Sequence, residues 1–412
     1  MGIVSRLEDA GFETWAVGGA VRDVVRGSPG AREDCDLATR ATPAEVRRLF
    51  PRTVPLGIDY GTVGVFGEDG VLYEVTTFRH DVLTYGRKAV VAFAETLEED
   101  LARRDFTINA IAWHPIRREV LDPHAGRKDI EDGVLRAVGS ASERFREDYL
   151  RILRGLRFAG TFGLEIHDDT WNGLVEAVPG IADLSMERVR EELMKVLGSG
   201  APSRALRLYE RSGALAEILP EFGVALTESA LDTVDALGRH RPVLRVAALL
   251  LFGLRKASQA MVSRLLVRLR FSNAEIGRIL AAMSGGLGPS SRLLRDSRAR
   301  RRWVATSRPE GVRDVFRIWL AAIRAGLVGA DASSTLQVIA EVRRDLRAGV
   351  PVSLAGLAIA GRDLIALGWS PGPGIGSTLR ALLEAVWEDP SLNDRATLER
   401  LAAEMVSPEA GA

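Results

Sequence analysis

The sequence predicts an α+β head followed by an all-α remainder, and three observations support this prediction. Up to about residue 140, short apolar runs bounded by glycines and charges recur, as is typical of strands. Beyond about residue 143 these runs fade, and Leu, Ala, Arg and Glu dominate at helical spacing. Breaks rich in Gly and Pro punctuate this second part, near 198–202, 285–289 and 371–376. We therefore expect a small mixed sheet with helices in the head, and helices alone beyond it.

The individual elements follow the chain in order. Strands are predicted in TWAVGG (14–19), CDLAT (35–39), GTVGVF (61–66) and VLYEVTTF (71–78). Helices are predicted in AVRDVVRG (20–27), PAEVRRLF (43–50), MERVREELMKVL (186–197) and PSRALRLYERSGALAEILPEF (202–222). Together with the breaks, this pattern predicts a head over 1–140, a helical neck over 141–200, a body over 201–320 and a tail over 321–412.

The composition excludes several classes of protein. No apolar run is long enough to cross a membrane, and the first residues lack the layout of a signal peptide. Cys35 is the only cysteine, which excludes an intrachain disulfide and a multi-cysteine metal site. Lys plus Arg and Asp plus Glu both number 55, so a polyanionic partner must be held by a local patch. A cytoplasmic protein is the expectation.

Asp34 and Asp36 stand one residue apart in a run that reads as a strand. Residues i and i+2 of a strand point to the same side, so the two carboxylates are expected to project together. Two carboxylates this close repel each other unless a cation joins them, and Mg²⁺ prefers such oxygen ligands. The alternative is a loop with two solvated acids, because D-x-D alone is a weak signal.

A glycine pair and an arginine precede these carboxylates in AVGGAVRD, residues 16–23. Paired glycines let backbone N–H groups approach a ligand, and the start of the following helix favours phosphate. Arg22 in that helix can bind a triphosphate. A plain strand–turn–helix with a surface arginine is the alternative. Followed shortly by D-x-D, the pattern indicates a nucleotidyltransferase that binds nucleotide phosphates and metal ions.

A third cluster lies in LARRDFTINAIA, residues 101–112. Arg103 or Arg104 could reach a phosphate, and Asp105 could accept a hydrogen bond from a ribose hydroxyl. The alternative is a charged helix end before a buried segment.

Charged residues recur every three positions in EDYLRILRGLRFAGTFG, at Asp148, Arg151, Arg154 and Arg157. An amphipathic helix with ion pairs between residues three apart is the ordinary explanation. The functional explanation concerns base edges. Cytosine and adenine both present an amino donor beside a ring-nitrogen acceptor, so an Asp acceptor beside an Arg donor would select them. Guanine and uracil would leave these groups unpaired.

Seven motifs then carry a family resemblance. They are AVGGAVRD, DCDLAT, YGTVGVF, YEVTTFR, RRDFTINAIA, DPHAGRKDIEDGVLRAVG and EDYLRILRGLRFA. In this order they resemble the class II CCA-adding tRNA nucleotidyltransferases, a family of the polymerase β nucleotidyltransferase superfamily that includes bacterial poly(A) polymerases. The match runs from about residue 12 to 165 and continues weakly through LLVRLRFSNAEIGRIL. A polymerase β-like catalytic head is what the resemblance implies.

The resemblance implies a role for each matching residue. Asp34 and Asp36 would be the catalytic carboxylates and would bind two Mg²⁺ ions. Gly19 and Arg22 would bind the phosphates of the nucleotide, Arg104 would contact the nucleotide, and Asp105 would contact its ribose. Asp148 and Arg151 would read the base edge, and Arg154 and Arg157 would support the nucleotide site. Glu74, in LYEVTTFR, is a candidate third acid.

The reaction that the resemblance implies is template-independent. The tRNA 3′-hydroxyl would attack the α-phosphate of CTP or ATP, and one site would add C, C and A in turn. The neck would recognise the base and the tail would bind tRNA. tRNA, CTP and ATP are thus the expected partners, and neither a membrane nor a protein partner is implied.

Three alternatives stay open. A poly(A) polymerase usually carries a basic stretch after D-x-D, where this chain reads PLGIDYGTVGVF. The second alternative is a partial enzyme, which adds either CC or A alone. A CC-adding enzyme lacks part of the loop before RRD, and this loop is full length here. Its segment TYGRKA nevertheless departs from the acidic-aromatic-basic run often found in the family. A non-catalytic RNA-binding relative is disfavoured by the intact acidic motifs.

The strongest basic cluster outside the head is RDSRARRRW, Arg295–Trp303. It could bind tRNA phosphates through counterion release. A solvated helix face is the slightly preferred explanation.

Overall fold

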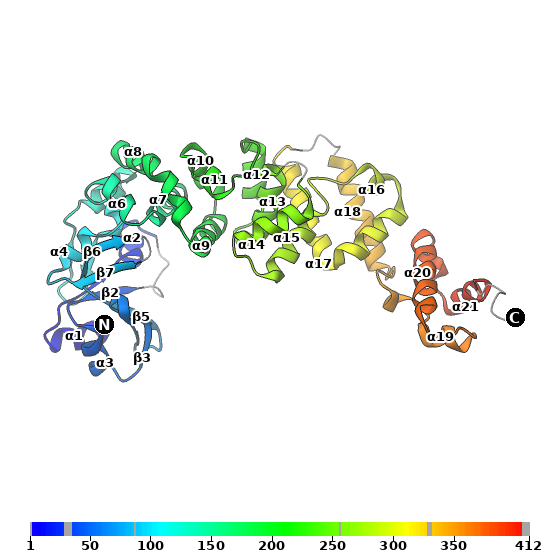
Figure 1. The fold of residues 1–412 in the computed structure, drawn as a ribbon, viewed down its shortest axis with the longest axis horizontal. Helices are drawn as coiled ribbons and strands as arrows, with labels where there is room; N and C mark the ends of the chain where they lie inside the picture. The colour runs from blue at the N-terminus through cyan, green and yellow to red at the C-terminus, as the bar shows by residue number, and fades with distance from the viewer. Residues whose placement is uncertain (1, 29–34, 86–87, 255–256, 328–331, 406–412) are drawn as a thin grey trace. The chain divides into compact units, whose positions relative to one another are not determined.

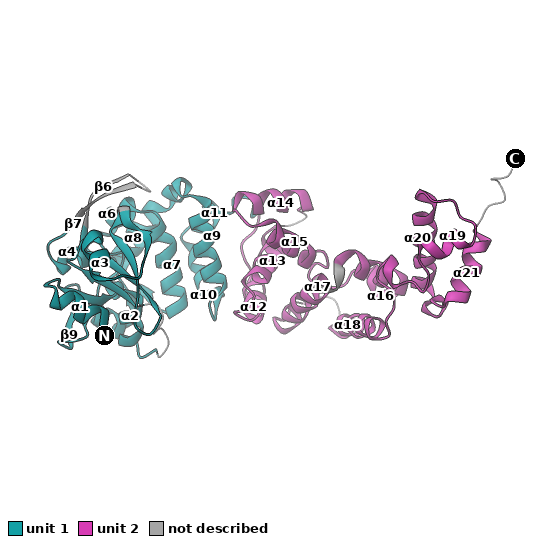
Figure 2. Cartoon of the chain, turned by 90° about the horizontal axis from the view of Figure 1, so that it is seen from below, with its two compact units in different colours: residues 1–222 teal, residues 223–412 magenta. Residues whose placement is uncertain are grey.

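The computed structural model describes residues 2–28, 35–85, 88–254, 257–327 and 332–405. The chain divides into two compact units, residues 1–222 and 223–412 (Figure 2). Every strand in the described residues belongs to the first unit, and the second unit holds helices. The predicted fold class is therefore confirmed, while the finer division at 140, 200 and 320 stays a prediction.

The first unit is built on a mixed sheet (Figure 1). The strand order of this sheet is β3-β4-β5-β2-β1-β8-β9. Only β2 and β5 are parallel; the other neighbours are antiparallel. The strands are β1 (Thr14–Val17), β2 (Asp36–Thr39), β3 (Thr53–Gly57), β4 (Thr62–Phe66), β5 (Leu72–Thr77), β8 (Ala112–His114) and β9 (Glu119–Leu121). All four strands predicted from the apolar runs are present.

Two short strand pairs accompany this sheet. β6 (Arg79–Tyr85) and β7 (Lys88–Phe93) are antiparallel, and residues 86–87 of TYGRKA lie outside the described residues. β10 (Val134–Leu135) and β11 (Glu165–Ile166) are parallel. β11 lies where helices alone were predicted, and that prediction is wrong at this point. With two residues, β11 is too short to produce a recognisable strand pattern.

Three of the four predicted helices are present as single helices over 19–25, 43–49 and 186–197, whereas the helix predicted over 202–222 is divided into two. The helices of the first unit are α1 (Gly2–Asp9), α2 (Gly19–Val25), α3 (Pro43–Leu49), η1 (Ile58–Tyr60), α4 (Leu97–Ala102), η2 (Thr107–Asn109), α5 (Gly126–Asp132), α6 (Ala141–Glu147), α7 (Leu150–Phe162), α8 (Asp168–Ala177), η3 (Val178–Asp183), α9 (Met186–Leu197), α10 (Pro202–Arg211) and α11 (Ala214–Ile218). α3 shows why a helix begins where it does, because Thr42 and Glu45 form a capping box around Pro43.

Each face of the sheet has its own apolar core. On one face Leu37 and Val75 pack with Leu7 of α1 and Val46 of α3. On the opposite face Val17 and Ala38 pack with Leu97 and Leu101 of α4. Side chains alternate along a strand, so Asp36 shares the α4 face with Ala38. This places the carboxylate beside the segment that follows α4.

The second unit consists of helices and two short 3₁₀ turns within the described residues. They are α12 (Glu228–Ala236), α13 (Pro242–Gly253), α14 (Gln259–Arg268), α15 (Asn273–Met283), α16 (Ser291–Arg295), α17 (Ser297–Arg324), α18 (Ala332–Arg347), η4 (Leu354–Gly356), α19 (Gly361–Ala366), α20 (Pro373–Glu388), η5 (Pro390–Leu392) and α21 (Arg395–Glu404). The break predicted at 285–289 lies between α15 and α16, whereas those at 371–376 and 198–202 extend into the first residues of α20 and α10. In the described parts of the chain, no helix combines the length and apolarity that a membrane span requires.

Candidate functional site

The turn between β1 and α2 brings Asp36 and Arg104 together. Asp36 pairs with Val17 across β1 and β2, and the residue after β1 is Gly18, with a φ of 78°. A Cβ on Gly18 would lie 3.2 Å from Asp36 Oδ2 and 3.5 Å from Arg104 Nη1. Glycine is needed here because of the positive φ and because a carboxylate and a guanidinium both lie against this peptide.

Only one of the two aspartates of D-x-D belongs to the described residues. Asp34 lies outside the described residues, so its projection beside Asp36 stays a prediction. Glu74 lies on β5, which runs parallel to β2 with Leu37 opposite Val75. Glu74 is therefore next to Asp36 on the same sheet face, and it is exposed. Within the described residues, no group of three side chains that could bind a metal ion is present.

Asp100 of α4 fixes the orientation of Arg103 and Arg104. Its Oδ1 accepts from Arg103 Nε at 3.0 Å, and its Oδ2 accepts from Arg104 Nη2 at 3.1 Å. The Asp100 side chain is only 2% exposed. Burial would raise its pKa, but the two arginines hold the pKa below its ordinary value. Asp100 therefore stays ionised and keeps Arg104 directed toward the Gly18 turn.

A buried chain of hydrogen bonds links α2 to α7 through Asp105. Asp105 Oδ2 lies 2.7 Å from Arg154 Nη2, and Asp105 Oδ1 accepts from Asn109 Nδ2 at 2.9 Å. Asn109 Oδ1 in turn accepts from Arg22 Nη1 at 2.8 Å. Three of the residues predicted to bind the nucleotide thus share one network.

Arg22 is largely buried in this network. Its Nε donates to Asp23 Oδ1 at 2.9 Å, and its guanidinium lies against the rings of Phe158 and Phe162. Burial lowers the pKa of Arg22, an effect that Asp23 opposes. A Cβ on Gly19 would lie 3.5 Å from Arg22 Nη2, so these two residues are adjacent as predicted.

Asp148 and Arg151 lie where α6 meets α7. Asp148 is the residue after α6 rather than part of α7, and its Oδ2 accepts from Arg188 Nη2 of α9 at 2.7 Å. Arg151 Nη1 donates to Glu147 Oε2 at 2.5 Å, and its Nη2 donates to the backbone oxygen of Arg103 at 3.1 Å. Both side chains are therefore held by neighbours outside the predicted set.

Arg157 is held by α9. Its Nε donates to Glu192 Oε2 at 2.6 Å, while Lys195 Nζ donates to Glu192 Oε1 at 2.8 Å. Burial would raise the pKa of Glu192, but Arg157 and Lys195 hold it below its ordinary value. Ion pairs between residues three apart were the ordinary explanation for this arginine row. Arg154 and Arg157 instead pair with acids far away in the sequence.

Sequence reasoning missed six residues that hold the predicted ones in place: Asp23, Asp100, Asn109, Glu147, Arg188 and Glu192. Three of them carried a local signal, because Asp100 and Glu147 stand four residues before the arginines they pair with and Asp23 follows Arg22 directly. The other three act across tertiary contacts, which no local pattern reveals.

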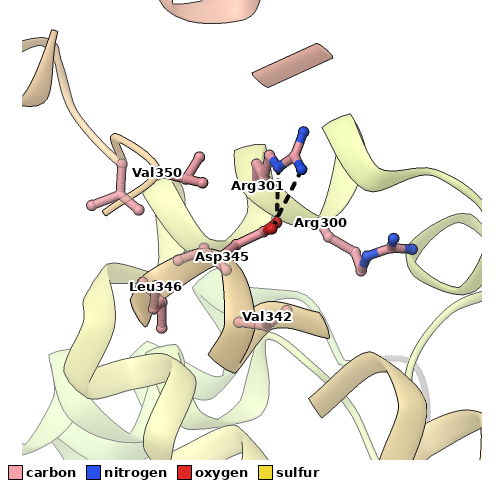
Figure 3. A pocket seen from close by; sticks show the side chains of 8 residues that line it. Arg300, Arg301, Val342, Asp345, Leu346 and Val350 are labelled. Carbon is pink, nitrogen blue, oxygen red and sulfur yellow. Dashed lines mark hydrogen bonds and ion pairs between the residues drawn. The ribbon is translucent and has the colours of Figure 1, made fainter. Parts of the chain in front are cut away.

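The basic cluster of the second unit is a set of ion pairs between helices. The pairs are Arg298 with Glu384 and Glu388, Arg300 with Glu341, Arg301 with Asp345, and Arg302 with Glu384. Figure 3 shows Arg301 and Asp345 beside a small hollow lined by valines of α17, α18 and the following loop. The prediction of a solvated face is wrong for Arg300 and Arg301, whose side chains are only 11% and 14% exposed.

Comparison with known proteins identifies the family. A model of the "Poly A polymerase head domain" matches residues 14–136, and one described as "Probable RNA and SrmB- binding site of polymerase A" matches residues 163–226. The CCA-adding enzyme of Leuconostoc mesenteroides is 33% identical over 99% of this chain and 96% of that enzyme. The CCA-adding enzyme of Geobacillus kaustophilus is 36% identical over 94% of this chain and 91% of that enzyme.

A solved structure agrees with these sequence matches. The crystal structure of the Bacillus stearothermophilus CCA-adding enzyme in complex with CTP superposes with a TM-score of 0.76, at 31% identity, over 98% of this chain and 95% of that chain. The similarity therefore covers both compact units and not the head alone. The chain belongs to the family of CCA-adding enzymes, as its seven motifs predicted.

Proposed function

We propose that this protein adds C, C and A to the 3′ end of tRNA from CTP and ATP, without a template and with release of pyrophosphate. The observation that carries the proposal is the meeting of Asp36 and Arg104 at the Gly18 turn, in a chain that matches CCA-adding enzymes over nearly its full length. The relative from Bacillus stearothermophilus is in complex with CTP, which supports CTP as a substrate. We expect the reaction in the cytoplasm.

Two Mg²⁺ ions are the proposed cofactor, with Asp34 and Asp36 as their ligands. Asp36 Oδ2 lies against the Gly18 turn, and Glu74 follows on the neighbouring strand, so hard oxygen donors gather on one sheet face. The donor set suits the ion. When bound, Mg²⁺ would stabilise negative charge on the attacking and leaving oxygens.

The nucleotide is proposed to lie along α7, from the base at Arg151 to the phosphates at Gly19. Asp105 would accept a hydrogen bond from the ribose hydroxyl, because a carboxylate oxygen has room for a second donor besides Arg154 or Asn109. Arg22 and Arg104 would neutralise phosphate charge. Arg154 and Arg157 would support the site by holding α7 against the head and α9.

Base choice is assigned to Asp148 and Arg151. Asp148 would accept from the amino group of cytosine or adenine, and Arg151 would donate to the ring nitrogen. Arg188 fixes Asp148, and Glu147 fixes Arg151. An acceptor and a donor held in this way leave guanine and uracil with unpaired groups, which costs about 1–3 kcal/mol for each buried group.

In the chemical step the 3′-hydroxyl oxygen of the tRNA would attack the α-phosphorus, and its proton would pass to solvent water. The new P–O bond forms as the bond to the β-phosphate oxygen breaks, and pyrophosphate leaves. Arg104, directed by Asp100, lies beside Asp36 and would stabilise the charge that develops on the phosphoryl oxygens. The helical tail over 321–412 is the proposed tRNA-binding part.

The test supplies each NTP alone to tRNA transcripts that lack CCA, lack only the final A, or are complete. The wild type should add C to the first and A to the second, and should leave the third unchanged. Asp36→Asn should fold normally and lose at least about 10³-fold in rate, since a neutral amide cannot bind the metal as the carboxylate does. A long A tail would instead indicate a poly(A) polymerase, and full activity of Asp36→Asn would refute the assigned site.

A further inference from the structure

The arginine one turn beyond Arg22 has no assigned role. Arg26 caps the C-terminal end of α2 and donates its backbone N–H to the backbone oxygen of Arg22 at 2.9 Å. Residues four apart lie on the same face of a helix, so Arg26 and Arg22 both face α7. The Arg26 guanidinium carbon lies 3.9 Å from the centroid of the Phe162 ring.

Arg22 and Arg26 differ in how far their guanidinium groups are occupied. All three nitrogens of Arg22 have a protein partner, because Nε and Nη2 contact Asp23 and Nη1 contacts Asn109. Arg22 is also 8% exposed, which leaves it little contact with a ligand. Among the residues that the structure describes, Arg26 has the Phe162 ring against its face and no carboxylate at its edge.

A guanidinium stacked on a ring keeps its N–H donors free around its edge. Stacking uses the π face of the cation, while the donors lie in its plane and suit two oxygens of a phosphate. Phe162 itself is stacked on Phe158, with a centroid distance of 5.7 Å and an interplanar angle of 13°. Arg26 is therefore held in place by a rigid aromatic pair, and its edge is available to an anion.

The contacts along α7 follow the order of the parts of a nucleotide. Arg151 stands at the proposed base position and Arg154 at the proposed ribose position, through Asp105. Phe158 and Phe162 then both meet Arg22, and Phe162, one turn further along α7, also meets Arg26. Each four-residue step advances about 6 Å along a helix. Arg26 thus comes one step beyond the residue assigned to the phosphates.

We propose that Arg26 binds the terminal phosphate of the incoming nucleoside triphosphate and, after transfer, the leaving pyrophosphate, with Phe162 as the ring that orients it. The proposal rests on the proposed function, because it takes the nucleotide to lie along α7. It assigns to Arg26 the distinction between triphosphate and diphosphate, while Arg22 would contribute its charge to the phosphate site from within the buried network.

The test is equilibrium binding of CTP, CDP and CMP by calorimetry, with Mg²⁺ and without tRNA, so that no turnover occurs. Arg26→Ala should weaken CTP binding about ten-fold, the loss of one charge-assisted contact, and leave CDP and CMP binding nearly unchanged. Inorganic pyrophosphate should become a correspondingly weaker competitor. Arg26→Lys and Phe162→Leu should each give an intermediate effect. Arg26→Lys keeps the positive charge without the guanidinium, and Phe162→Leu keeps the guanidinium without the stacked ring.

The matched control is Arg6→Ala. Arg6 belongs to α1, and its guanidinium carbon lies 5.3 Å from the centroid of the Phe50 ring. Its loss should leave all three affinities unchanged. An unaltered ratio of CTP to CDP affinity in Arg26→Ala would overturn the proposal, even if the wild type extends tRNA. A wild type that neither binds CTP nor extends tRNA would overturn the proposed function along with it. A general loss of affinity for all three nucleotides would show a structural role and also refute the proposal.

Discussion

Arg154 Nη2 and Asp105 Oδ2 lie 2.7 Å apart and join α7 to the segment after α4. The Asp105 side chain is 7% exposed. Burial would raise its pKa, but Arg154 and the hydrogen bond from Asn109 hold the pKa below its ordinary value. The same pair raises the pKa of Arg154. The attachment of α7 to the segment after α4 therefore depends on the same carboxylate that we propose as the ribose contact.

Asp105→Asn should lower the free energy of unfolding by about 1–3 kcal/mol at pH 7, because the partly exposed Arg154 keeps its charge without its partner. A folded pKa below the unfolded value of about 3.9 means that this stability is present above pH 3.9 and is lost as pH falls through the folded pKa. Urea unfolding of the variant and the wild type, at pH 7 and near pH 3, measures the difference in the free energy of unfolding at each pH.

The difference between variant and wild type should therefore shrink at the lower pH. Asp169→Asn is the control, since Asp169 is 89% exposed and its change should cost almost nothing at either pH. An equal loss at both pH values would show that the charge of Asp105 is not what stabilises the contact.

Gly18→Ala should inactivate the protein far more than it destabilises it. The positive φ costs about 1–3 kcal/mol for a residue with a side chain. The new Cβ would also lie 3.2 Å from Asp36 Oδ2 and displace it, which we expect to cost about 100-fold in kcat.

Gly11→Ala separates these two effects. Gly11 has a φ of 85° with nothing within 4 Å of an added Cβ, so its substitution brings the strain alone. It should lower the melting temperature by a similar amount and leave kcat unchanged. Equal activity of the two variants would contradict the placement of Asp36 at the Gly18 turn.

Asp148→Ala should weaken the choice between CTP and UTP. Removal of the acceptor for the cytosine amino group should lower the ratio of kcat/KM values, CTP over UTP, by about ten-fold or more. Arg188→Ala should produce a smaller change in the same direction, because Arg188 only positions Asp148. Competition between the two nucleotides on one tRNA transcript gives this ratio directly. A fall in both rates with the ratio preserved would remove Asp148 from base choice.

The sequence predicted what depends on short-range pattern. Alternating apolar runs marked β1, β2, β4 and β5, and the Gly-Gly turn with Asp36 marked the site. The partners of the site residues could not be predicted, because Asp105 meets Arg154 and Arg157 meets Glu192 only after α7 and α9 have packed. A sequence shows the charge of a polar side chain but not the tertiary contact in which that charge is paired.

The arginine cluster on α17 illustrates the same limit. Its density of charge suggested either a phosphate-binding patch or a solvated face, and each arginine instead meets an acid on α18 or α20. Arg301 also donates to the backbone oxygen of Trp387 at 2.6 Å. The acids responsible lie some forty to ninety residues further along the chain.

Arg301→Ala should therefore destabilise the second unit, by about 1–3 kcal/mol, without changing the salt dependence of tRNA binding. Glu384→Gln discriminates between the two explanations for the neighbouring arginines. With ion pairs between helices it should lower the melting temperature, whereas with a phosphate-binding patch it should strengthen tRNA binding. A shallower slope of log affinity against log salt in Arg301→Ala would restore the phosphate-binding explanation.

Complete CCA addition is tested most directly by one reaction. A tRNA transcript that lacks CCA is incubated with the wild type, Mg²⁺ and all four NTPs, and the 3′ ends of the products are sequenced. We predict that C, C and A are added in that order and that growth then stops. Incorporation of G or U, or a tail that continues beyond the first A, would contradict the assignment of base choice and of the CCA-adding reaction to this site.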